Sequence, residues 1–303
     1  MNPYCRLLKK DIDIECFVDG ILKINGMESK RVAINKIAAA ERNLNGYDSA
    51  CTLTHEDYRD FQYRDEKVRE TLRMQIVQEL ESLERLDSDD SITLGTGGAK
   101  PKTKISAKKK LYYIVGPPAS GKSTVANKIA DVTGSYILDS DYAKRKFPEY
   151  ENQIGGAALV HEESDRLIFS YENGNLLDYC IKNEYNIIIP KIGHNILKIK
   201  GFCQKMKQIG YDPYLISVDL DRVKATQRAY TRYVETNRYV PLSLIFDGYG
   251  NQPTLNYFKL KQQNNDLFNG FAQITTDVPK GATPILLEQK NLTQFKKIFG
   301  GET

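Results

Sequence analysis

From about residue 111 onward, short apolar runs alternate with segments of helical character. Runs of this kind, separated by helical segments, predict a mostly parallel sheet with helices on both faces. The runs are LYYIV at 111–115, SYILDS at 135–140, YNIIIP at 185–190 and YDPYLISVDL at 211–220. A further strand, turn and strand are expected around residues 279–281, where Pro, Lys and Gly mark a turn. We therefore predict an α/β domain over residues 111–303.

The first 95 residues follow a helical pattern instead. Apolar side chains recur every three or four residues, which places them on one face of a predicted helix. They are Val68, Leu72, Ile76, Leu80 and Leu83. An earlier helix is expected over residues 29–44. Residues 1–95, which carry no catalytic signature, are predicted to form a small helical module that either packs on the main domain or acts as a regulatory cover or partner-binding module.

A stretch without apolar periodicity separates the two parts. The sequence DSDDSITLGTGGAKPKTKISAKKK at 87–110 is rich in Asp, Ser and Gly and ends in a run of lysines. This composition is typical of loops and linkers, and we predict a basic linker over residues 96–110. Short basic linkers are usually only solvated. We therefore assign this one no role and do not expect the protein to bind nucleic acid.

The composition limits the class of protein. Hydrophobic residues make up 41% of the 303 residues, which is enough for a packed core. No apolar run approaches the roughly 20 residues that span a bilayer, and acidic residues stand where the apolar centre of a signal peptide would lie. The five cysteines lack metal-binding spacing, so we expect reduced thiols. These features predict a cytoplasmic protein without membrane contact.

Charge is distributed unevenly along the chain. Residues 1–95 contain 14 Lys and Arg against 19 Asp and Glu, whereas residues 96–303 contain 29 against 20. The first part is therefore acidic, and the second is basic and suited to anionic ligands. This difference motivates the hypothesis that the acidic helices cover the anion-binding site of the basic part in the same chain.

The first predicted strand runs directly into a glycine-rich segment. The sequence GPPASGKST at 116–124 fits the phosphate-binding pattern GxxxxGK[ST], with a strand before it and a helix from about Lys122 after it. In such a loop backbone N–H groups point at phosphate oxygens, the lysine reaches the β- and γ-phosphates, and the serine ligates Mg²⁺. The predicted ATP-binding residues are Gly116, Pro117, Pro118, Ala119, Ser120, Gly121, Lys122, Ser123 and Thr124.

The second predicted strand ends in two carboxylates. Asp139 and Asp141 lie at its carboxyl end, the edge at which α/β sheets bind ligands. Phosphate transfer to a hydroxyl needs a carboxylate that accepts the proton of the acceptor. We predict that Asp141 is this base and that Asp139 supports Mg²⁺ through water. The alternative interpretation is that the two residues only cap the next helix.

Several arginines follow the fourth predicted strand. Arg228 and Arg232 lie four residues apart and so share one face of a predicted helix, and Arg238 follows in the next loop. Guanidinium groups can neutralise the charge that develops on a transferred phosphate. We therefore predict that these three arginines act on the γ-phosphate of ATP.

Taken together, these segments resemble a known family of P-loop kinases. The sequence GPPASGKST, followed by DSDYAKRKFPEY, VHEES and TRYVETNRYVP, is similar to the zeta-toxin family over roughly residues 108–250. The resemblance implies a toxin-like, ATP-dependent kinase, with a helical antitoxin or the chain's own helices as a regulatory partner. It assigns the kinase chemistry to Lys122, Ser123, Asp141, Arg232 and Arg238, and less directly to Arg228. It places His161, Glu162 and Ser164 at the acceptor site.

The chain departs from the family pattern after the third predicted strand. Family members that phosphorylate sugar nucleotides tend to have a Glu-Gly-Thr-like motif there, whereas this chain reads IIIPKIGHN. Lys191 in this segment is a candidate contact for an acceptor phosphate. The expected acceptor is a nucleotide-containing molecule of the UDP-N-acetylglucosamine type. The alternatives are a kinase of NAD or another nucleotide, a polynucleotide 5′-kinase, and a non-catalytic nucleotide-binding protein, the last disfavoured by the intact Lys122 and Ser123.

Overall fold

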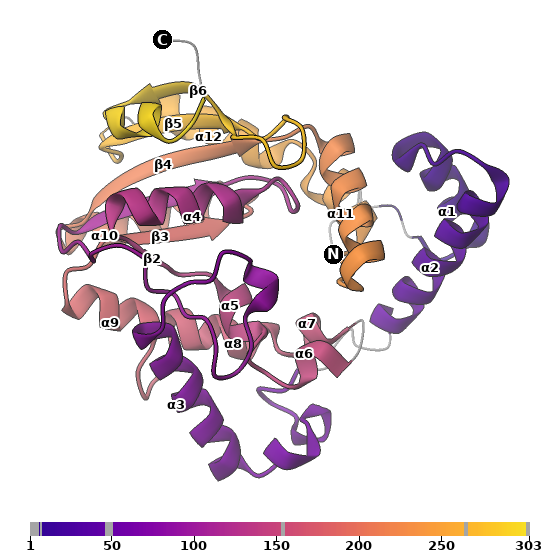
Figure 1. Cartoon of the computed structure of the whole chain (residues 1–303), viewed down its shortest axis with the longest axis horizontal. Helices are drawn as coiled ribbons and strands as arrows, with labels where there is room; N and C mark the ends of the chain where they lie inside the picture. The colour runs from indigo at the N-terminus through magenta and orange to yellow at the C-terminus, as the bar shows by residue number, and fades with distance from the viewer. Residues whose placement is uncertain (1–5, 7, 46–50, 153–154, 264–265, 301–303) are drawn as a thin grey trace.

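A six-stranded sheet forms the centre of the molecule (Figure 1). The computed structural model describes residues 6, 8–45, 51–152, 155–263 and 266–300. Within them the strands lie in the order β2-β3-β1-β4-β5-β6, and only β6 is antiparallel to its neighbour. The strands are β1 (Lys110–Val115), β2 (Tyr136–Ile137), β3 (Ile187–Lys191), β4 (Asp212–Asp219), β5 (Gly270–Thr275) and β6 (Ile285–Lys290). The predicted P-loop α/β fold, with helices preceding it, is confirmed.

The central strands form where the sequence is apolar enough to be buried on both faces. In β1 all residues from 111 to 115 are buried, and in β4 all residues from 213 to 218 are buried. Tyr113 of β1 lies opposite Ile189 of β3 on one side and Leu215 of β4 on the other. Continuous apolar runs are typical of such doubly covered parallel strands, which explains why the pattern alone located them.

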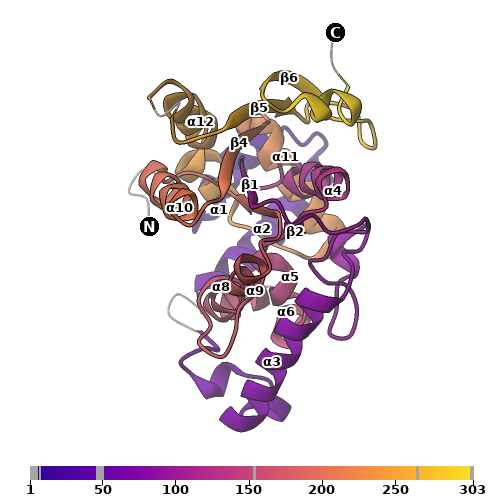
Figure 2. The same cartoon turned by 90° about the vertical axis from the view of Figure 1, so that its left-hand side faces the viewer.

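Helices cover both faces of the sheet. Figure 2 shows α4 (Lys122–Thr133) on one face and α10 (Ile196–Gln208) and α12 (Gln252–Gln263) on the other. The chain therefore leaves the neighbouring strands β1 and β3 toward opposite faces, which opens a ligand crevice at their carboxyl ends. The remaining helices of this part are α5 (Ser140–Lys144), α6 (Glu149–Asn152), α7 (Gly156–Leu159), α8 (His161–Phe169), α9 (Leu176–Lys182) and α11 (Arg222–Thr236), with a π-type turn η5 (Leu244–Tyr249) and a 3₁₀ turn η6 (Thr293–Lys297).

Helix α3 (Glu66–Ser82) joins the core around the sheet. The Asp65 side chain caps its start by accepting hydrogen bonds from two backbone N–H groups. Most of the predicted apolar stripe is buried in this core, at Leu72, Ile76 and Leu80. Val68 in the first turn is 43% exposed. Short 3₁₀ turns flank the helix at η2 (Glu56–Tyr58), η3 (Phe61–Tyr63) and η4 (Asp89–Ser91).

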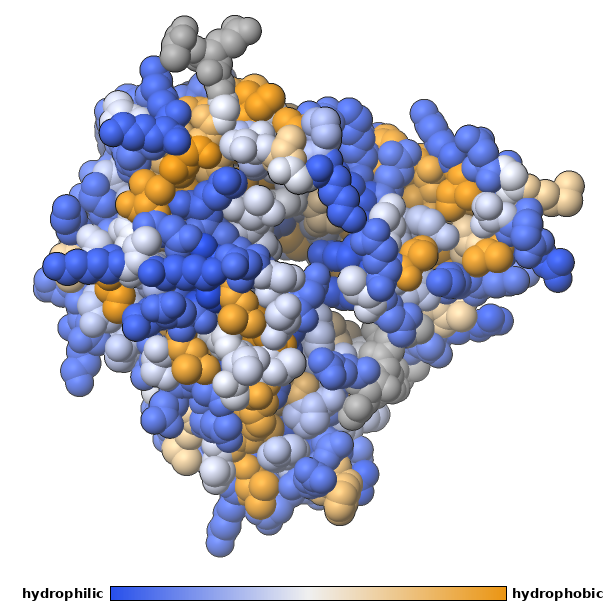
Figure 3. Space-filling model, viewed as in Figure 1, coloured by the Kyte–Doolittle hydropathy of each residue, from blue (hydrophilic) through white to orange (hydrophobic). Residues whose placement is uncertain are grey.

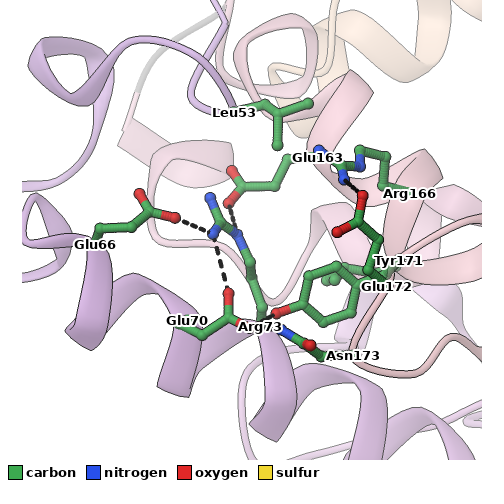
Figure 4. Close-up of a pocket in the computed structure, with 10 residues that line it drawn as sticks. Leu53, Glu66, Glu70, Arg73, Glu163, Arg166, Tyr171, Glu172 and Asn173 are labelled. Carbon is green, nitrogen blue, oxygen red and sulfur yellow. Dashed lines mark hydrogen bonds and ion pairs between the residues drawn. The ribbon is translucent and has the colours of Figure 1, made fainter.

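Buried ion pairs attach α3 to α6 and α8. The fully buried Arg69 side chain donates to Glu149 at 2.8 Å and to Glu163 at 2.8 and 2.6 Å. Arg73, one turn later, donates to Glu163 at 2.7 Å and also pairs with Glu66 (Figure 4). The cavity beside Arg73, about 240 Å³ in volume, is lined mainly by charged side chains that already pair with one another. We interpret this region as the interface through which α3 packs on α6 and α8.

The first two helices pack elsewhere. Helices α1 (Asp11–Phe17) and α2 (Met27–Asn45), joined by the π-type turn η1 (Val18–Leu22), form an N-terminal hairpin over residues 11–45. Its apolar side chains form a second cluster with α11 and η5, separate from the core around the sheet. Figure 1 shows the hairpin beside α11, at the side of the molecule away from α3. The helices of residues 1–95 thus divide between two cores, whereas the sequence predicted one module; the domain boundaries themselves stay a prediction.

The predicted linker is an irregular segment held by the sheet domain. Ala99 is buried, and its carbonyl accepts a hydrogen bond from Ile137 N at 3.0 Å. Lys102 pairs with Asp87 at 2.5 Å, and Lys109 pairs with Glu184 at 2.9 Å. Part of its positive charge is therefore neutralised within the chain, and the absence of a role for this segment stays a prediction.

Two further findings bear on the composition. No helix within the described residues is long and apolar enough to cross a membrane. Cys16, Cys51, Cys180 and Cys203 are free thiols. Cys5, the fifth cysteine of the sequence, lies outside the described residues.

Candidate active site

A large cleft opens at the carboxyl ends of the central strands. Its volume is about 1550 Å³, and its walls come from the loop after β1, α5, α8, the end of β3, α11 and the loop at 276–284. In the space-filling view the surface is hollowed near its centre, between the sheet domain and the N-terminal hairpin (Figure 3). Among the described residues of the first 95, only Asp89 and Asp90 line the cleft. The hypothesis that the acidic helices cover the ATP site is therefore not supported by their position.

The loop after β1 has the geometry of a phosphate cradle. A Cβ atom on Gly116 would lie 2.6 Å from the Val218 carbonyl oxygen, so only glycine fits there. Gly121 adopts a left-handed conformation (φ +79°) at the start of α4, which a side chain would strain. Backbone N–H groups at this helix start carry a partial positive charge that suits phosphate. Pro118, Ala119 and Thr124 line the cleft beside them, and Pro117 and Ser120 are buried behind it.

Lys122 already points back along this loop. Its Nζ atom donates to the carbonyl oxygens of Gly116 at 2.9 Å and Pro117 at 2.7 Å. Burial lowers the pKa of Lys122 to about 8, although the charges of Asp139 and Asp141 act in the opposite direction. Nearby phosphate oxygens would favour the protonated form of the lysine, because opposite charges stabilise each other. The loop therefore offers a buried lysine whose positive charge an anion would stabilise.

The two aspartates after β2 have different environments. Asp139 caps α5 by accepting a hydrogen bond from Asp141 N at 3.0 Å, as the capping interpretation predicted, and it also lines the cleft. Burial and the neighbouring Asp141 raise the pKa of Asp139 to about 6. Burial would also raise the pKa of Asp141, but the charges of Lys144 and Arg238 outweigh it and hold this pKa well below its usual value. Two carboxylates with pKa values moved apart are typical of sites that divide acid and base roles.

Asp141 lies between two cations. Its Oδ1 atom accepts from Lys144 Nζ at 2.8 Å, and its Oδ2 atom accepts from Arg238 Nη2. Arg145 donates to the backbone carbonyl of Asp141 at 3.3 Å and to Asp90 Oδ1 at 2.6 Å. The carboxylate is therefore ionised and held in place by this set of charges.

The three predicted arginines reach the same cleft but differ in their contacts. Arg228 donates to the carbonyl oxygens of Thr276 at 2.8 Å and Val278 at 3.4 Å, so it holds the loop at 276–284. Arg238 pairs with Asp141. The Nε atom of Arg232 is buried without a hydrogen-bond partner among the described residues, and burial, with the charge of Arg238, lowers the pKa of Arg232 to about 10. Of the three arginines, Arg232 is thus the one whose charge an anionic ligand would stabilise most.

The opposite wall of the cleft contains two of the four predicted acceptor contacts. His161 and Lys191 line it, and Lys191 Nζ pairs with Asp165 at 2.9 Å and lies 4.3 Å from the centre of the Phe169 ring. Glu162 is exposed outside the cleft, where it accepts a hydrogen bond from Cys51 Sγ at 3.4 Å.

Ser164 is fully buried outside the cleft. The expectation for Glu162 and Ser164 is corrected by their positions. His161 and Asp165, four residues apart on α8, line the cleft together, whereas Glu162 is exposed outside it and Ser164 is buried in the protein.

Sequence reasoning missed several charged residues of the site, among them Lys144, Asp165 and Asp90. Lys144 follows Asp141 by three residues and Asp165 follows His161 by four, and these helical spacings were a usable signal. Asp90 gave no signal, because it lies 55 residues before its partner Arg145 and in a segment predicted as a loop.

The donor atoms in the cleft suit Mg²⁺ bound together with phosphate. Ser123 is exposed in the first turn of α4, and Asp139 lies on the same cleft. No group of three or more His, Cys, Asp or Glu among the described residues could hold a metal ion on its own. Mg²⁺ usually takes one or two protein oxygen ligands and completes its shell with water and substrate phosphates. The residues present fit that mode of binding.

Comparisons with solved structures give distant similarities. A structure from the PezAT chromosomal toxin–antitoxin system of Streptococcus pneumoniae aligns with a TM-score of 0.47 and 17% identity over 67% of this chain and 82% of that one. The AvrRxo1-ORF1:AvrRxo1-ORF2 complex with ATP aligns with a TM-score of 0.45 and 15% identity over 82% and 75%. A putative kinase from Chloroflexus aurantiacus aligns with a TM-score of 0.37 and 15% identity over 46% and 78%.

Comparison with protein families identifies the family of the chain, whereas comparison with individual curated proteins finds no relative. No curated protein matches the chain significantly. The model of the zeta toxin family matches residues 96–261, which is more than half of the chain and includes the P-loop, both aspartates and the three arginines. The chain belongs to the zeta toxin family.

Proposed function

We propose that the protein is an ATP- and Mg²⁺-dependent kinase that transfers the γ-phosphate of ATP to a hydroxyl group of a nucleotide-containing acceptor. The observation that carries this proposal is the convergence of the P-loop, Asp141 and the arginines on one cleft. Membership of the zeta toxin family supports the reaction class. The UDP-N-acetylglucosamine type of acceptor is the first candidate, as in the family members that phosphorylate sugar nucleotides.

The roles follow from the positions of the side chains. Lys122 and the N–H groups at the start of α4 would hold the β- and γ-phosphates, and Ser123 with Asp139 would hold Mg²⁺, which neutralises charge on the phosphate oxygens. Asp141 accepts the proton of the acceptor hydroxyl as that oxygen bonds to the γ-phosphorus, and ADP leaves with the electrons of the broken P–O bond. Arg232 and Arg238 stabilise the charge on the transferred group.

The Asp141–Arg238 ion pair links nucleotide binding to the base. Arg238 donates to one carboxylate oxygen of Asp141. When Arg238 moves to the γ-phosphate, Asp141 loses one of the cations that lower its pKa and becomes the stronger base. We propose that ATP thereby activates Asp141 for the acceptor.

The acceptor side of the cleft is rich in cations. Lys144, Lys191, Lys198 and Lys205 line the cleft, and Tyr113, Phe169 and Phe202 lie among them. Ammonium groups suit acceptor phosphates, and aromatic faces suit a planar base. Pro190 and Ile192 also line this wall and offer no side-chain hydrogen bond to a sugar hydroxyl. This last observation favours NAD or another nucleotide as the second candidate acceptor.

A γ-³²P transfer assay with Mg²⁺ tests the proposal. The panel contains UDP-N-acetylglucosamine, other UDP-sugars, NAD, nucleosides and a short RNA, with Lys122→Ala as the blank. A labelled product that depends on Lys122 supports the kinase, and its identity separates the candidate acceptors. Labelled RNA would instead indicate a polynucleotide kinase. ATP binding without a product from any acceptor would favour the non-catalytic alternative.

The resemblance to the zeta-toxin family also implies a regulatory partner, and this partner remains a proposal. We propose that a helical antitoxin-like partner would act at the mouth of the cleft, because none of the described residues of α1, α2 and α3 lines it. A purified helical antitoxin that failed to lower the transfer rate at any ratio would count against this partner class.

A further inference from the structure

The residue after Arg238 is a buried tyrosine, Tyr239, which contributes to the lining of the cleft and whose hydroxyl reaches the N-terminal hairpin. Asn237 ends α11 in a left-handed conformation (φ 59°), so the chain turns directly before this pair. Arg238 then reaches Asp141 in the cleft. Tyr239 is 5% exposed, and its hydroxyl donates to Glu41 Oε1 in α2 at 2.5 Å. Two adjacent residues are therefore tied to different partners, Arg238 to the cleft carboxylate and Tyr239 to the hairpin.

The N-terminal hairpin holds the arginine-bearing helix at both ends. Near the start of α11, Gln227 Nε2 donates to the Ile21 carbonyl oxygen at 3.0 Å. Near its end, the Tyr233 hydroxyl donates to the Lys36 carbonyl oxygen at 3.2 Å. The Tyr233 and Tyr239 rings pack edge to face with their centres 4.9 Å apart. The hairpin thus contacts residues that directly precede or follow Arg228, Arg232 and Arg238 in the sequence. It does not line the cleft itself.

The contact between Tyr239 and Glu41 has a consequence for Arg238. An arginine in a loop loses much conformational freedom when it is held at one position, so its placement depends on how firmly the backbone beside it is fixed. The Tyr239 ring is buried in the second apolar cluster, and burial raises the pKa of both Tyr239 and Glu41. The tyrosine therefore stays protonated as a donor at neutral pH, and the contact persists under assay conditions.

We propose that Glu41, acting through Tyr239, is a positioning residue for Arg238, and that the N-terminal hairpin is thereby part of the phosphate site. This inference rests on the proposed role of Arg238 at the γ-phosphate of ATP. It differs from the expected regulatory cover, because the hairpin supports the arginines from behind and leaves the cleft open.

The test compares ATP with ADP, since only ATP carries the phosphate that Arg238 contacts. Dissociation constants for both nucleotides with Mg²⁺ are measured by calorimetry on the full chain, together with the unfolding midpoint of each variant. The variants are Arg238→Ala as reference, Tyr239→Phe, Glu41→Ala and Glu41→Gln. Asp247→Asn is the matched control, because it removes a 2.6 Å ion pair with Arg6, which packs on Phe17 and Phe246 of the same cluster, and neither partner lines the cleft.

The expected result is a selective loss of ATP preference. Tyr239→Phe and Glu41→Ala should lower the ratio of ADP to ATP dissociation constants by about three- to tenfold, the value of one hydrogen bond. Glu41→Gln keeps an acceptor for the tyrosine and should retain the wild-type ratio, as should Asp247→Asn. A wild-type ratio in Tyr239→Phe and Glu41→Ala, with a reduced ratio in Arg238→Ala, overturns the positioning role alone. A wild-type ratio in Arg238→Ala overturns both this role and the proposed function of Arg238.

Discussion

At the scale of single residues, the cleft contains two aspartates that lie at the start of one short helix but have different environments. Asp139 is tied to the start of α5, and Asp141 is held by Lys144 and Arg238. The same local sequence therefore provides one carboxyl group that titrates near pH 6 and one that stays ionised. Asp141 is the better placed of the two to receive a proton, because its charge is maintained at neutral pH.

Asp141→Asn should abolish transfer and leave ATP binding intact. The amide keeps the shape of the carboxylate but cannot take the proton of the acceptor, so we expect kcat to fall by about 10²- to 10⁴-fold. The Kd for ATP should change little, because Lys122 and the P-loop are untouched. Asp277→Asn, which breaks only an exposed pair with Lys224, is the control and should keep its activity. Near-normal turnover of Asp141→Asn would refute its assignment as base.

The pH dependence of kcat/KM for ATP should be bell-shaped. Asp139 must be ionised to support Mg²⁺, so activity is lost as the pH falls through about 6. Lys122 must be protonated to hold phosphate, so activity is lost as the pH rises through about 8. Initial rates between pH 5 and 9 measure both limbs. Asp139→Asn should remove the acid limb at a reduced rate, and an unchanged acid limb in this variant would contradict the assignment.

At the scale of elements, α3 is fixed to the sheet domain by buried charge. Arg69 and Glu163 are almost fully excluded from water, and each satisfies the other together with Glu149. Such a network is costly to build, and it is more costly to leave half complete. The docking of α3 should therefore depend on the whole set.

Arg69→Met should destabilise the protein strongly. It leaves Glu149 and Glu163 without their shared partner, and breaking a buried pair typically costs about 3–5 kcal/mol. The free energy of unfolding from urea titration measures this loss. Lys280→Met is the control, because its 3.5 Å pair with Glu235 is exposed and should contribute less than about 1 kcal/mol. Equal losses in the two variants would show that the network does not hold α3.

The sequence predicted the elements whose signal is local. The buried strands β1 and β4 and the P-loop between β1 and α4 could be read directly, because each lies in one continuous segment. The partition of the N-terminal helices between two cores could not, because the apolar faces of α2 and α3 look alike until their partners are known. Asp90 was missed for the same reason, since its role depends on a long-range contact with Arg145.

At the scale of the whole molecule, α11 joins the nucleotide cleft to the N-terminal hairpin. Arg228 and Arg232 line the cleft from one face of α11, and Ala225 and Ala229 pack in the second cluster from another. A ligand that orders the arginines should therefore also steady the hairpin, although the hairpin lies outside the cleft.

Hydrogen exchange should detect this connection. Adding ATP and Mg²⁺ should slow amide exchange in α2 as well as in the P-loop, because both are held through α11. Helix α3 belongs to the other core and provides the internal comparison, where exchange should change less. Lys122→Ala, which weakens ATP binding, should show neither effect. Protection confined to the P-loop would mean that α11 does not transmit the binding event.

The pairing of the hairpin with α11 also sets an order of assembly. Residues 8–40 of the second cluster can pack against their partners only after residues 220–246 have been synthesised, about 180 residues later in the chain. At the usual speed of translation this delay is on the order of tens of seconds, during which the apolar face of the hairpin has no native partner on the ribosome. The hairpin can support the arginine-bearing helix only after residue 246 has been made, so a chain that stops before this residue would lack a competent phosphate site.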